Sequence, residues 1–325
     1  MSDCGTHVNL DYELQMVTNM TTEIQTQLSM AADIRITQAL RAYLAGVFSD
    51  YAHDVDLGFY DVVPDETGDW PRLQHQSHIM DANQSSYILY IPIRKYMHLA
   101  VANLAENGLV SLRDYEYCHQ VRLEQEPRDT IPSHKTGLFT ARKRMEFQET
   151  LEDQQVDVNL YMANCGSSII IDTVGSGIRD MRVYASGFAT AFEICDSSYV
   201  FSHSPVVVAD KVELEEEEGC ICFSAITFPS RDPSEDAKAI IETEDPFISD
   251  LSEDALWEYR VYTTLADGTV TESLLGVFKP LRAGQFTIIK ARVQRGDGAV
   301  IPGDATVGVS ITTHWKEGME HVVPL

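Results

Sequence analysis

The amino-acid sequence predicts a mostly β protein with two antiparallel β-sandwich domains and one or two short helices in the first. Apolar and polar residues alternate in short runs along the chain, which is typical of half-buried strands. After Glu152 these runs recur at steady intervals with few helical patterns between them, which favours a sandwich over βαβ units. The 325 residues suffice for two cores. We therefore expect an amino-terminal domain over residues 1–153 and a carboxy-terminal domain over residues 154–325.

The first predicted domain begins with a strand over residues 7–17. Apolar residues at three- and four-residue spacing predict a helix over residues 36–47, with Asp33 as its N-cap. A further strand is expected over residues 53–63, and the turn-forming residues of segment 64–76 predict a loop. A turn is expected at residues 106–108, and segment 138–150 fits either a short helix or a strand.

Segment 86–104, with the sequence SYILYIPIRKYMHLAVANL, predicts two strands joined by a tight connection. Pro92 has no backbone N–H to donate to a neighbouring strand, so it belongs at a strand end. One face of the second strand carries Met97, Leu99 and Val101, and the other carries His98, Ala100 and Ala102. We expect the first of these faces to be buried as a wall of the amino-terminal sandwich.

The second predicted domain consists of strands separated by turns. The hairpin signal is clearest at Asp267-Gly268, because these residues tolerate the positive φ of a tight turn. The expected strands cover residues 156–164, 169–172, 178–185, 190–194, 206–208, 220–228, 257–265, 269–278, 285–293 and 306–313.

The charge of the chain excludes some classes of partner. It has 24 basic and 50 acidic side chains, which gives a formal net charge of −26. Such a field repels phosphate backbones and anionic lipid headgroups, so we expect no binding to nucleic acid and no electrostatic attachment to membranes. No apolar run approaches the ~20 residues that a membrane-spanning helix needs.

The six cysteines match no zinc-binding spacing. We interpret them as small apolar side chains buried in strands, with Cys220 and Cys222 on the same face of one strand. A disulfide from Cys4 to a distant cysteine remains open.

His75 and His78, with Asp81 nearby, could imitate a metal site. Zinc requires three or four rigidly held ligands, whereas this group is expected in a loop without further ligands. We therefore interpret it as part of a solvated loop and predict no metal site.

Three further motifs that could be binding sites are interpreted as turns or solvent-exposed connections. Gly175-Ser-Gly177 lacks the strand and helix that surround a dinucleotide-binding loop. The acidic run 213–218 lacks the spacing of a calcium loop. Segment 295–298 contains Arg-Gly-Asp, which some adhesins present to integrins, but its residues also make a good turn. Asn19 and Asn83 begin glycosylation tripeptides, which carry little weight without a eukaryotic secretory source.

The sequence contains no GxSxG motif and no recognisable cysteine–histidine nucleophile. No residue is predicted to be catalytic, to bind a cofactor or to hold a metal. We therefore predict a protein that is not an enzyme.

The order of several segments carries a resemblance to a known family. The segments are VNLDYEL, VDLGFYDVV, YILYIPIRKYMHLAVANL, VNLYMANCGSSIIID and IRDMRVYASGFATAFEICDSSYVF. In this order they resemble the Bacteroidales fimbrial anchor family, whose members are outer-membrane lipoproteins that hold fimbrillin pili. The resemblance covers most of the chain and is weakest over residues 230–254.

This resemblance implies two transthyretin-like sandwiches, export as a lipoprotein and a place on the cell surface, at the outer membrane. It also implies a role in pilus attachment, assembly or length control and in cell adhesion. The implied partners are fimbrillins or other pilus subunits, which pair through β-strand addition. The lipid would be carried by Cys4 or by a cysteine that precedes this sequence.

Two other functions remain open. A surface carbohydrate-binding module could stack sugars on aromatic rings, although core packing explains the same residues. The candidates are Trp70, Tyr87, Tyr90, Trp257 and Tyr259. A glycoside hydrolase would need two carboxylates ~5–10 Å apart across a cleft.

The first strand gives a specific expectation. In the fimbrial class, stalk subunits are thought to lose an amino-terminal strand, whereas an anchor that stops the fibre should keep it. No lysine or arginine occurs before Arg35, so a trypsin-like protease has no site near residues 8–17. We expect this strand to be hydrogen-bonded within the amino-terminal sheet.

Overall fold

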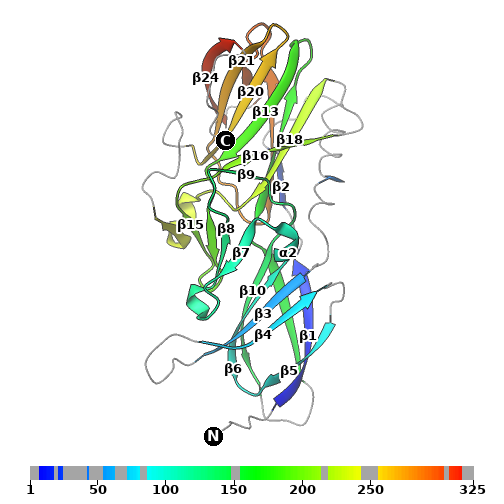
Figure 1. Cartoon of the computed structure of the whole chain (residues 1–325), viewed down its shortest axis with the longest axis vertical. Coiled ribbons are helices and arrows are strands. Elements are labelled where there is room, and N and C mark those ends of the chain that lie inside the picture. The colour runs from blue at the N-terminus through cyan, green and yellow to red at the C-terminus, as the bar shows by residue number, and fades with distance from the viewer. Residues whose placement is uncertain are drawn as a thin grey trace.

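The computed structural model describes residues 7–17, 21–24, 42–43, 54–62, 72–80, 86–147, 154–213, 219–242, 255–303 and 307–316. These residues form 24 strands, one short α-helix and two 3₁₀ turns. The prediction of a mostly β protein is therefore confirmed. The strands belong to four sheets, which we call sheets A to D, and the molecule is elongated along one axis (Figure 1).

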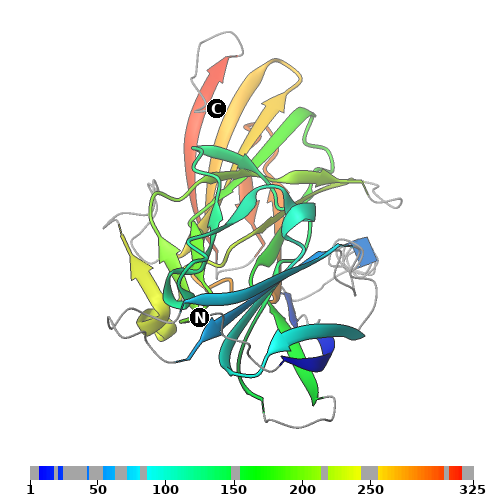
Figure 2. The same ribbon diagram turned by 60° about the horizontal axis from the view of Figure 1, so that its bottom comes forward.

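Sheet A forms the lower half of the molecule in Figure 1 and has seven strands in the order β4-β3-β6-β10-β11-β1-β5. Figure 2 brings these strands to the front of the view. Their bounds are β1 (His7–Val17), β3 (Asp54–Asp61), β4 (Leu73–Met80), β5 (Ser86–Pro92), β6 (Lys95–Ala102), β10 (Phe139–Glu146) and β11 (Gln154–Met162).

Sheets B and C lie in the upper half, and both mix antiparallel with parallel pairs. Sheet B contains β17 (Asp210–Val212), β18 (Cys220–Thr227), β12 (Cys165–Asp172), β22 (Gln285–Val293) and β2 (Thr21–Ile24), with β23 (Val300–Pro302) also paired to β22. Sheet C contains β24 (Val307–Lys316), β21 (Thr269–Val277), β20 (Trp257–Leu265), β13 (Ile178–Ser186), β16 (Val206–Val208) and β9 (Thr130–Pro132).

Sheet D is a smaller sheet at the middle of the molecule. It contains β19 (Ala239–Ile241), β15 (Ser198–Phe201), β14 (Ala191–Glu193), β8 (Arg122–Gln125) and β7 (Val110–Arg113). The helical elements beside it are α2 (Leu104–Asn107), η1 (Cys118–Gln120) and η2 (Pro233–Lys238).

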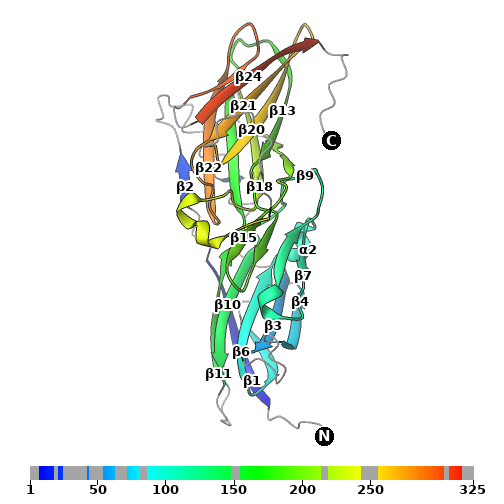
Figure 3. The ribbon, with the colours of Figure 1, turned by 90° about the vertical axis from the view of Figure 1, so that its left-hand side faces the viewer.

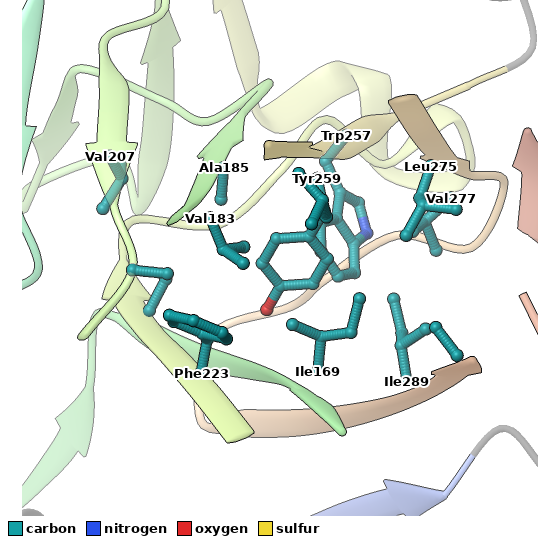
Figure 4. Close-up of a cluster of buried hydrophobic side chains, with 14 of the residues drawn as sticks. Ile169, Val183, Ala185, Val207, Phe223, Trp257, Tyr259, Leu275, Val277 and Ile289 are labelled. Atoms are coloured by element: carbon teal, nitrogen blue, oxygen red, sulfur yellow. The ribbon is translucent and has the colours of Figure 1, made fainter. Parts of the chain in front are cut away.

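Sheets B and C enclose a core that we call the upper core. Figure 4 shows Ile169, Phe223 and Ile289 of sheet B facing side chains of sheet C. Trp257 and Tyr259 are fully buried there, with ring centroids 5.4 Å apart in an edge-to-face arrangement. Such aromatic pairs add to the stabilisation that apolar burial gives.

Strand β6 is buried on both faces because side chains of other sheets pack against each of them. Leu99 and Val101 pack in a cluster with residues of sheet D, which we call the A–D core. On the other face Ala100 joins a cluster that also contains Phe286 of sheet B. The predicted burial of Leu99 and Val101 is confirmed, whereas Met97 on the same face is only partly buried against the A–D core. The expectation of a half-buried strand is wrong.

Some predicted elements need correction. Segment 64–76 was expected to be a loop, but its described part enters β4, which begins at Leu73 and pairs with β3. The expected turn at residues 106–108 contains the end of α2, which closes at Gly108 with a φ of 69°. Segment 138–150 contains the strand β10. Within the predicted helix 36–47 only Ala42 and Tyr43 are described, and both are helical.

The sheets combine strands from both sides of residue 153. Sheet A includes β11, and sheet D pairs β8 with β14. Strand β2 pairs in parallel with β22, so the chain has passed from sheet A to sheet B by Thr21 (Figure 3). The division into domains at this position and their transthyretin-like arrangement stay predictions.

Candidate functional site

The first strand, β1, lies in the interior of sheet A. It pairs in parallel with β11, from Leu10 opposite Gln154 to Val17 opposite Tyr161. On its other side it pairs antiparallel with β5, over the whole of His7–Glu13. The prediction that residues 8–17 are hydrogen-bonded within the amino-terminal sheet is confirmed. Removing β1 would separate β5 from β11 and leave two new strand edges.

The last described strand, β24, has the opposite position. It pairs with β21 from Val307 to Lys316, and it ends sheet C among the described strands. An edge strand presents unpaired backbone N–H and C=O groups to which another chain can add a strand. Strand β5 is the edge of sheet A among the described strands, and there Ile88 and Tyr90 are 79% and 64% exposed. These two edges are the candidate assembly surfaces.

A cleft of about 910 Å³ lies where sheet D meets β10, and we call it the cysteine cleft. Strand β10 contributes Arg142 and Arg144, which point away from the cluster that holds Ala141 and Met145. The remaining lining residues come mainly from η1, β8 and the turn after β14, and they include Cys118, His119, Arg122, Glu193, Cys195 and Asp196.

Opposite charges are mixed in the cysteine cleft. Arg122 lies 3.6 Å from Asp114 and 3.4 Å from Glu124, measured between nitrogen and oxygen atoms. Burial, followed by the nearby charge of Asp196, raises the pKa of Glu193. The guanidinium of Arg142 donates a hydrogen bond to the backbone carbonyl of Cys195. The cleft therefore has no strong preference for one sign of charge.

A second cleft, of about 490 Å³, lies between β11, sheet D and η2, and we call it the tyrosine cleft. The ring of Tyr161 is 57% exposed there, whereas Tyr199 stacks at a tilt on Phe192 with centroids 4.6 Å apart. Arg282 Nε donates to Asp232 Oδ2 at 2.5 Å. Burial alone would raise the pKa of Asp232, but its hydrogen bonds from Arg282 and Ser234 lower it.

The predicted loop histidines lie on a strand. His75 and His78 belong to β4, where His78 Nδ1 lies 2.6 Å from Asp56 Oδ1 and His75 Nε2 lies 2.9 Å from Ser77 Oγ. Asp81 lies outside the described residues. Across the described part of the chain, no group of three or more His, Cys, Asp or Glu side chains is arranged to hold a metal ion.

The glycine and Arg-Gly-Asp motifs form turns, as predicted. Gly175 and Gly177 both have a φ of 70° and connect β12 to β13. Residues 295–298 connect β22 to β23, and the Asp297 carboxylate accepts a hydrogen bond from the backbone N–H of Ala299 at 3.1 Å. The aspartate thus stabilises its own turn. Asn19, Asn83 and most of the acidic run, residues 214–218, lie outside the described residues.

The aromatic candidates separate into two groups. Trp257 and Tyr259 belong to the upper core, and Tyr259 donates a hydrogen bond to Ser167 Oγ at 2.7 Å. Core packing is therefore confirmed for these two, while Tyr90 is exposed. Trp70 and the side chain of Tyr87 lie outside the described residues.

The cysteines include one pair that the sequence did not reveal. Cys118, Cys165 and Cys222 are buried, Cys195 and Cys220 are partly buried, and Cys4 is not described. The Sγ atoms of Cys118 and Cys195 lie 3.3 Å apart although the residues are 77 positions apart. No spacing pattern in the sequence predicts that these two thiols meet, because the pairing of strands in sheet D brings them together.

Comparison with known proteins reveals similarity of fold. No family model and no curated protein matches the chain. A candidate adhesin from Bacteroides ovatus is similar with a TM-score of 0.53 and 12% identity, over 90% of this chain and 94% of that one. A candidate polysaccharide-binding protein from Bacteroides thetaiotaomicron has a TM-score of 0.50 and 10% identity, over 93% and 97%.

The fimbrial anchor protein Mfa2 from Porphyromonas gingivalis has a TM-score of 0.45 and 11% identity, over 95% of this chain and 98% of that one. The similarity of fold to the candidate adhesin from Bacteroides ovatus extends over nearly the full length of the chain. No described helix has the length and apolar character needed to cross a membrane.

Proposed function

We propose that this chain is a non-enzymatic cell-surface protein that serves as a pilus anchor or accessory subunit. It would act in fimbrial assembly and cell adhesion by pairing β-strands with fimbrillins. A lipid at its amino-terminal end would hold it at the outer membrane. The order of the sequence segments and the fold shared with a candidate adhesin support this proposal.

The observation that carries the proposal is the pairing of β1 on both sides. A stalk subunit accepts a neighbour's strand in the groove that a lost strand leaves. Here the corresponding place is occupied by the chain's own first strand, so sheet A accepts no strand at that position. A subunit of this kind can end a fibre while a strand such as β24, at an edge of the described part of sheet C, binds the adjacent pilin.

The test compares the intact chain with a variant that lacks residues 1–18. We expect the intact chain to stay monodisperse in size-exclusion chromatography, and the variant to aggregate or to capture purified fimbrillin at the opened groove. A synthetic peptide of residues 7–17 should suppress this capture, which separates a specific groove from general unfolding. A variant that stays monomeric, keeps its melting temperature and binds nothing new would contradict the proposal.

The tyrosine cleft supports a second candidate function, the binding of a surface carbohydrate. An exposed ring such as Tyr161 can stack on a sugar, and Asp232 and Arg282 can bind its hydroxyl groups. A glycan array probed with the intact chain and with Tyr161→Ala tests this function. Binding that Tyr161→Ala retains in full would exclude the tyrosine cleft as the site.

A further inference from the structure

Two thiols meet at the wall of the cysteine cleft. Cys118 is the first residue of η1 and is 2% exposed, whereas Cys195 follows β14 and is partly buried. Their Sγ atoms lie 3.3 Å apart, which is within the distance of a thiol–thiol hydrogen bond. Both side chains line a cleft of about 910 Å³, so a small disulfide can reach them.

The backbone of sheet D holds these two thiols together. Glu193 of β14 pairs with Arg122 of β8, and the N–H of Ile194 donates to the Val121 carbonyl at 3.1 Å. On the other side, the η1 turn is closed by a hydrogen bond from the Gln120 N–H to the Tyr117 carbonyl at 2.9 Å. Since regular pairing fixes both segments, the approach of the sulfur atoms is a property of the sheet.

We propose that Cys118 and Cys195 are a site of oxidative modification, where exchange with a disulfide compound forms an internal disulfide bond. In the first step the Cys195 thiolate attacks one sulfur of the disulfide, giving a mixed disulfide and releasing one thiolate. In the second step Cys118 loses its proton and attacks Cys195 Sγ, which releases the second thiolate. Two protein thiols are thereby oxidised by two electrons, and one external disulfide is reduced to two thiols.

The groups around the two thiols indicate that Cys195 is the nucleophile that attacks the external disulfide. The hydrogen bond between the thiols lowers the pKa of Cys195 and raises that of Cys118. The Arg142 guanidinium, which donates to the Cys195 carbonyl, also favours a thiolate at this position. Cys195 is the less buried of the two, so the external disulfide meets it first.

The bond would join two distant parts of the chain. Sheet D is assembled from β7 and β8 on one side and β14, β15 and β19 on the other, and β8 pairs with β14 over three residues. A disulfide between Cys118 and Cys195 would add a covalent link beside this short pairing. It would therefore stabilise the folded chain by restricting the unfolded one.

The experiment uses the full chain with Cys4→Ser, which removes competing exchange at the amino-terminal end. One sample is treated with oxidised glutathione and one with dithiothreitol, and both are alkylated in denaturant and mapped by mass spectrometry. We expect oxidation to link the peptides that contain Cys118 and Cys195, with a loss of two hydrogens. The melting temperature should rise by about 4–8 °C relative to the reduced sample.

Two controls keep the outcome interpretable. The variant Cys195→Ser should give no linked peptide and no rise in melting temperature on oxidation. In a second pair of samples alkylated without denaturant, Cys165 should stay unmodified before and after oxidation, because it is fully buried and its Sγ donates to the Thr227 carbonyl. Full alkylation of Cys118 and Cys195 after oxidation would overturn the proposal. So would a persistent glutathione adduct on Cys195 without the internal link.

Discussion

The upper core and the lower half of the molecule are held together in different ways. Between sheets B and C, Trp257 and Tyr259 are the largest buried side chains, and the buried polar side chains are mainly small hydroxyls such as Ser167, Thr263 and Ser273. Around sheet A, buried polar side chains stand next to the apolar ones. They include Asp54, His98, Asn103, Asn107 and, at the junction with sheet B, Asn164.

The buried polar groups of the lower half hold the ends of strands. Asp54 Oδ2 accepts from the N–H groups of Leu104 and Ala105 at 3.1 and 3.2 Å, so β3 fixes the start of α2. Asn164 accepts from the Leu138 N–H at 3.0 Å and donates to the Thr136 carbonyl at 2.9 Å. Unpaired, such groups would each cost about 1–3 kcal/mol, so they specify one geometry.

This comparison shows how the two halves respond to change. Both halves depend on packing and on satisfied hydrogen bonds, but the upper half buries mainly small hydroxyl groups, whereas the lower half buries carboxylate, amide and imidazole groups. The halves are not independent, because one buried cluster contains Phe59 and Phe139 of sheet A together with Phe286 and Ile288 of sheet B. A substitution that destabilises the lower half should therefore also lower the stability of the upper half.

The largest expected effect is that of Val101→Asp in the A–D core. Val101 is 2% exposed, so the new carboxylate would be buried without a partner, at a cost of about 4–5 kcal/mol. We expect urea denaturation, followed by circular dichroism and tryptophan fluorescence, to show one transition at a lower midpoint. Asn159→Asp, at an exposed position on β11, is the matched control and should change little. An unchanged midpoint for Val101→Asp would show that β6 is not a wall of the core.

The sequence predicted strands well where an apolar face must be buried. The predicted bounds of β1, β20 and β22 agree with the structure, and β20 and β22 are followed by turns. Strand β4 was missed because it has few apolar residues and lies at the edge of sheet A as far as the described strands show. Its described side chains are exposed or half-buried in alternation. An edge strand gains backbone pairing without needing an apolar face, so periodicity does not detect it.

The pairing between distant segments could not be predicted from the sequence. Alternation shows that β1 is a strand, but it does not show that β1 runs parallel to β11 and antiparallel to β5. The same holds for the thiols of Cys118 and Cys195, which meet only because β8 pairs with β14. Likewise, the alternation places His98 on the face opposite Leu99 and Val101, but it does not show that this face is also buried, where the His98 ring stacks on Phe59 with centroids 4.4 Å apart.

A smaller effect is expected from pH, and it should arise outside the upper core. Burial lowers the pKa of His98 and of His134 to about 3, although the hydrogen bond from His98 to the Gly58 carbonyl opposes the shift there. The unfolded chain binds a proton at each histidine below pH ~6.5, whereas the folded chain does so only near pH 3. Stability should therefore fall as the pH drops through this window, by about 2 kcal/mol per histidine between pH 7 and 5.

Urea denaturation at pH 7 and pH 5 measures this loss. The variant His98→Phe should lose about half as much stability over the interval as the parent chain, because one of the two titrating groups is gone. His203→Gln, at an exposed position, should keep the parent's pH dependence. Equal pH dependence in all three proteins would show that the buried imidazoles do not determine the acid sensitivity of the lower half.

The smallest effect is expected from glycine substitutions in two turns, one from each half of the molecule. Gly108 ends α2 in the lower half with a φ of 69°, and Gly177 connects β12 to β13 in the upper half with a φ of 70°. At both positions an added Cβ would meet no atom within 4 Å, so only backbone strain opposes a side chain. Gly108→Ala and Gly177→Ala should each cost about 1 kcal/mol, and substitution by Asn less, because Asn tolerates this region better. A single urea transition that both variants shift equally would show that both halves unfold together. A clearly smaller loss for Gly108→Ala would show that the α2 turn opens before the rest of the molecule, so that the shared cluster fails to couple the two halves.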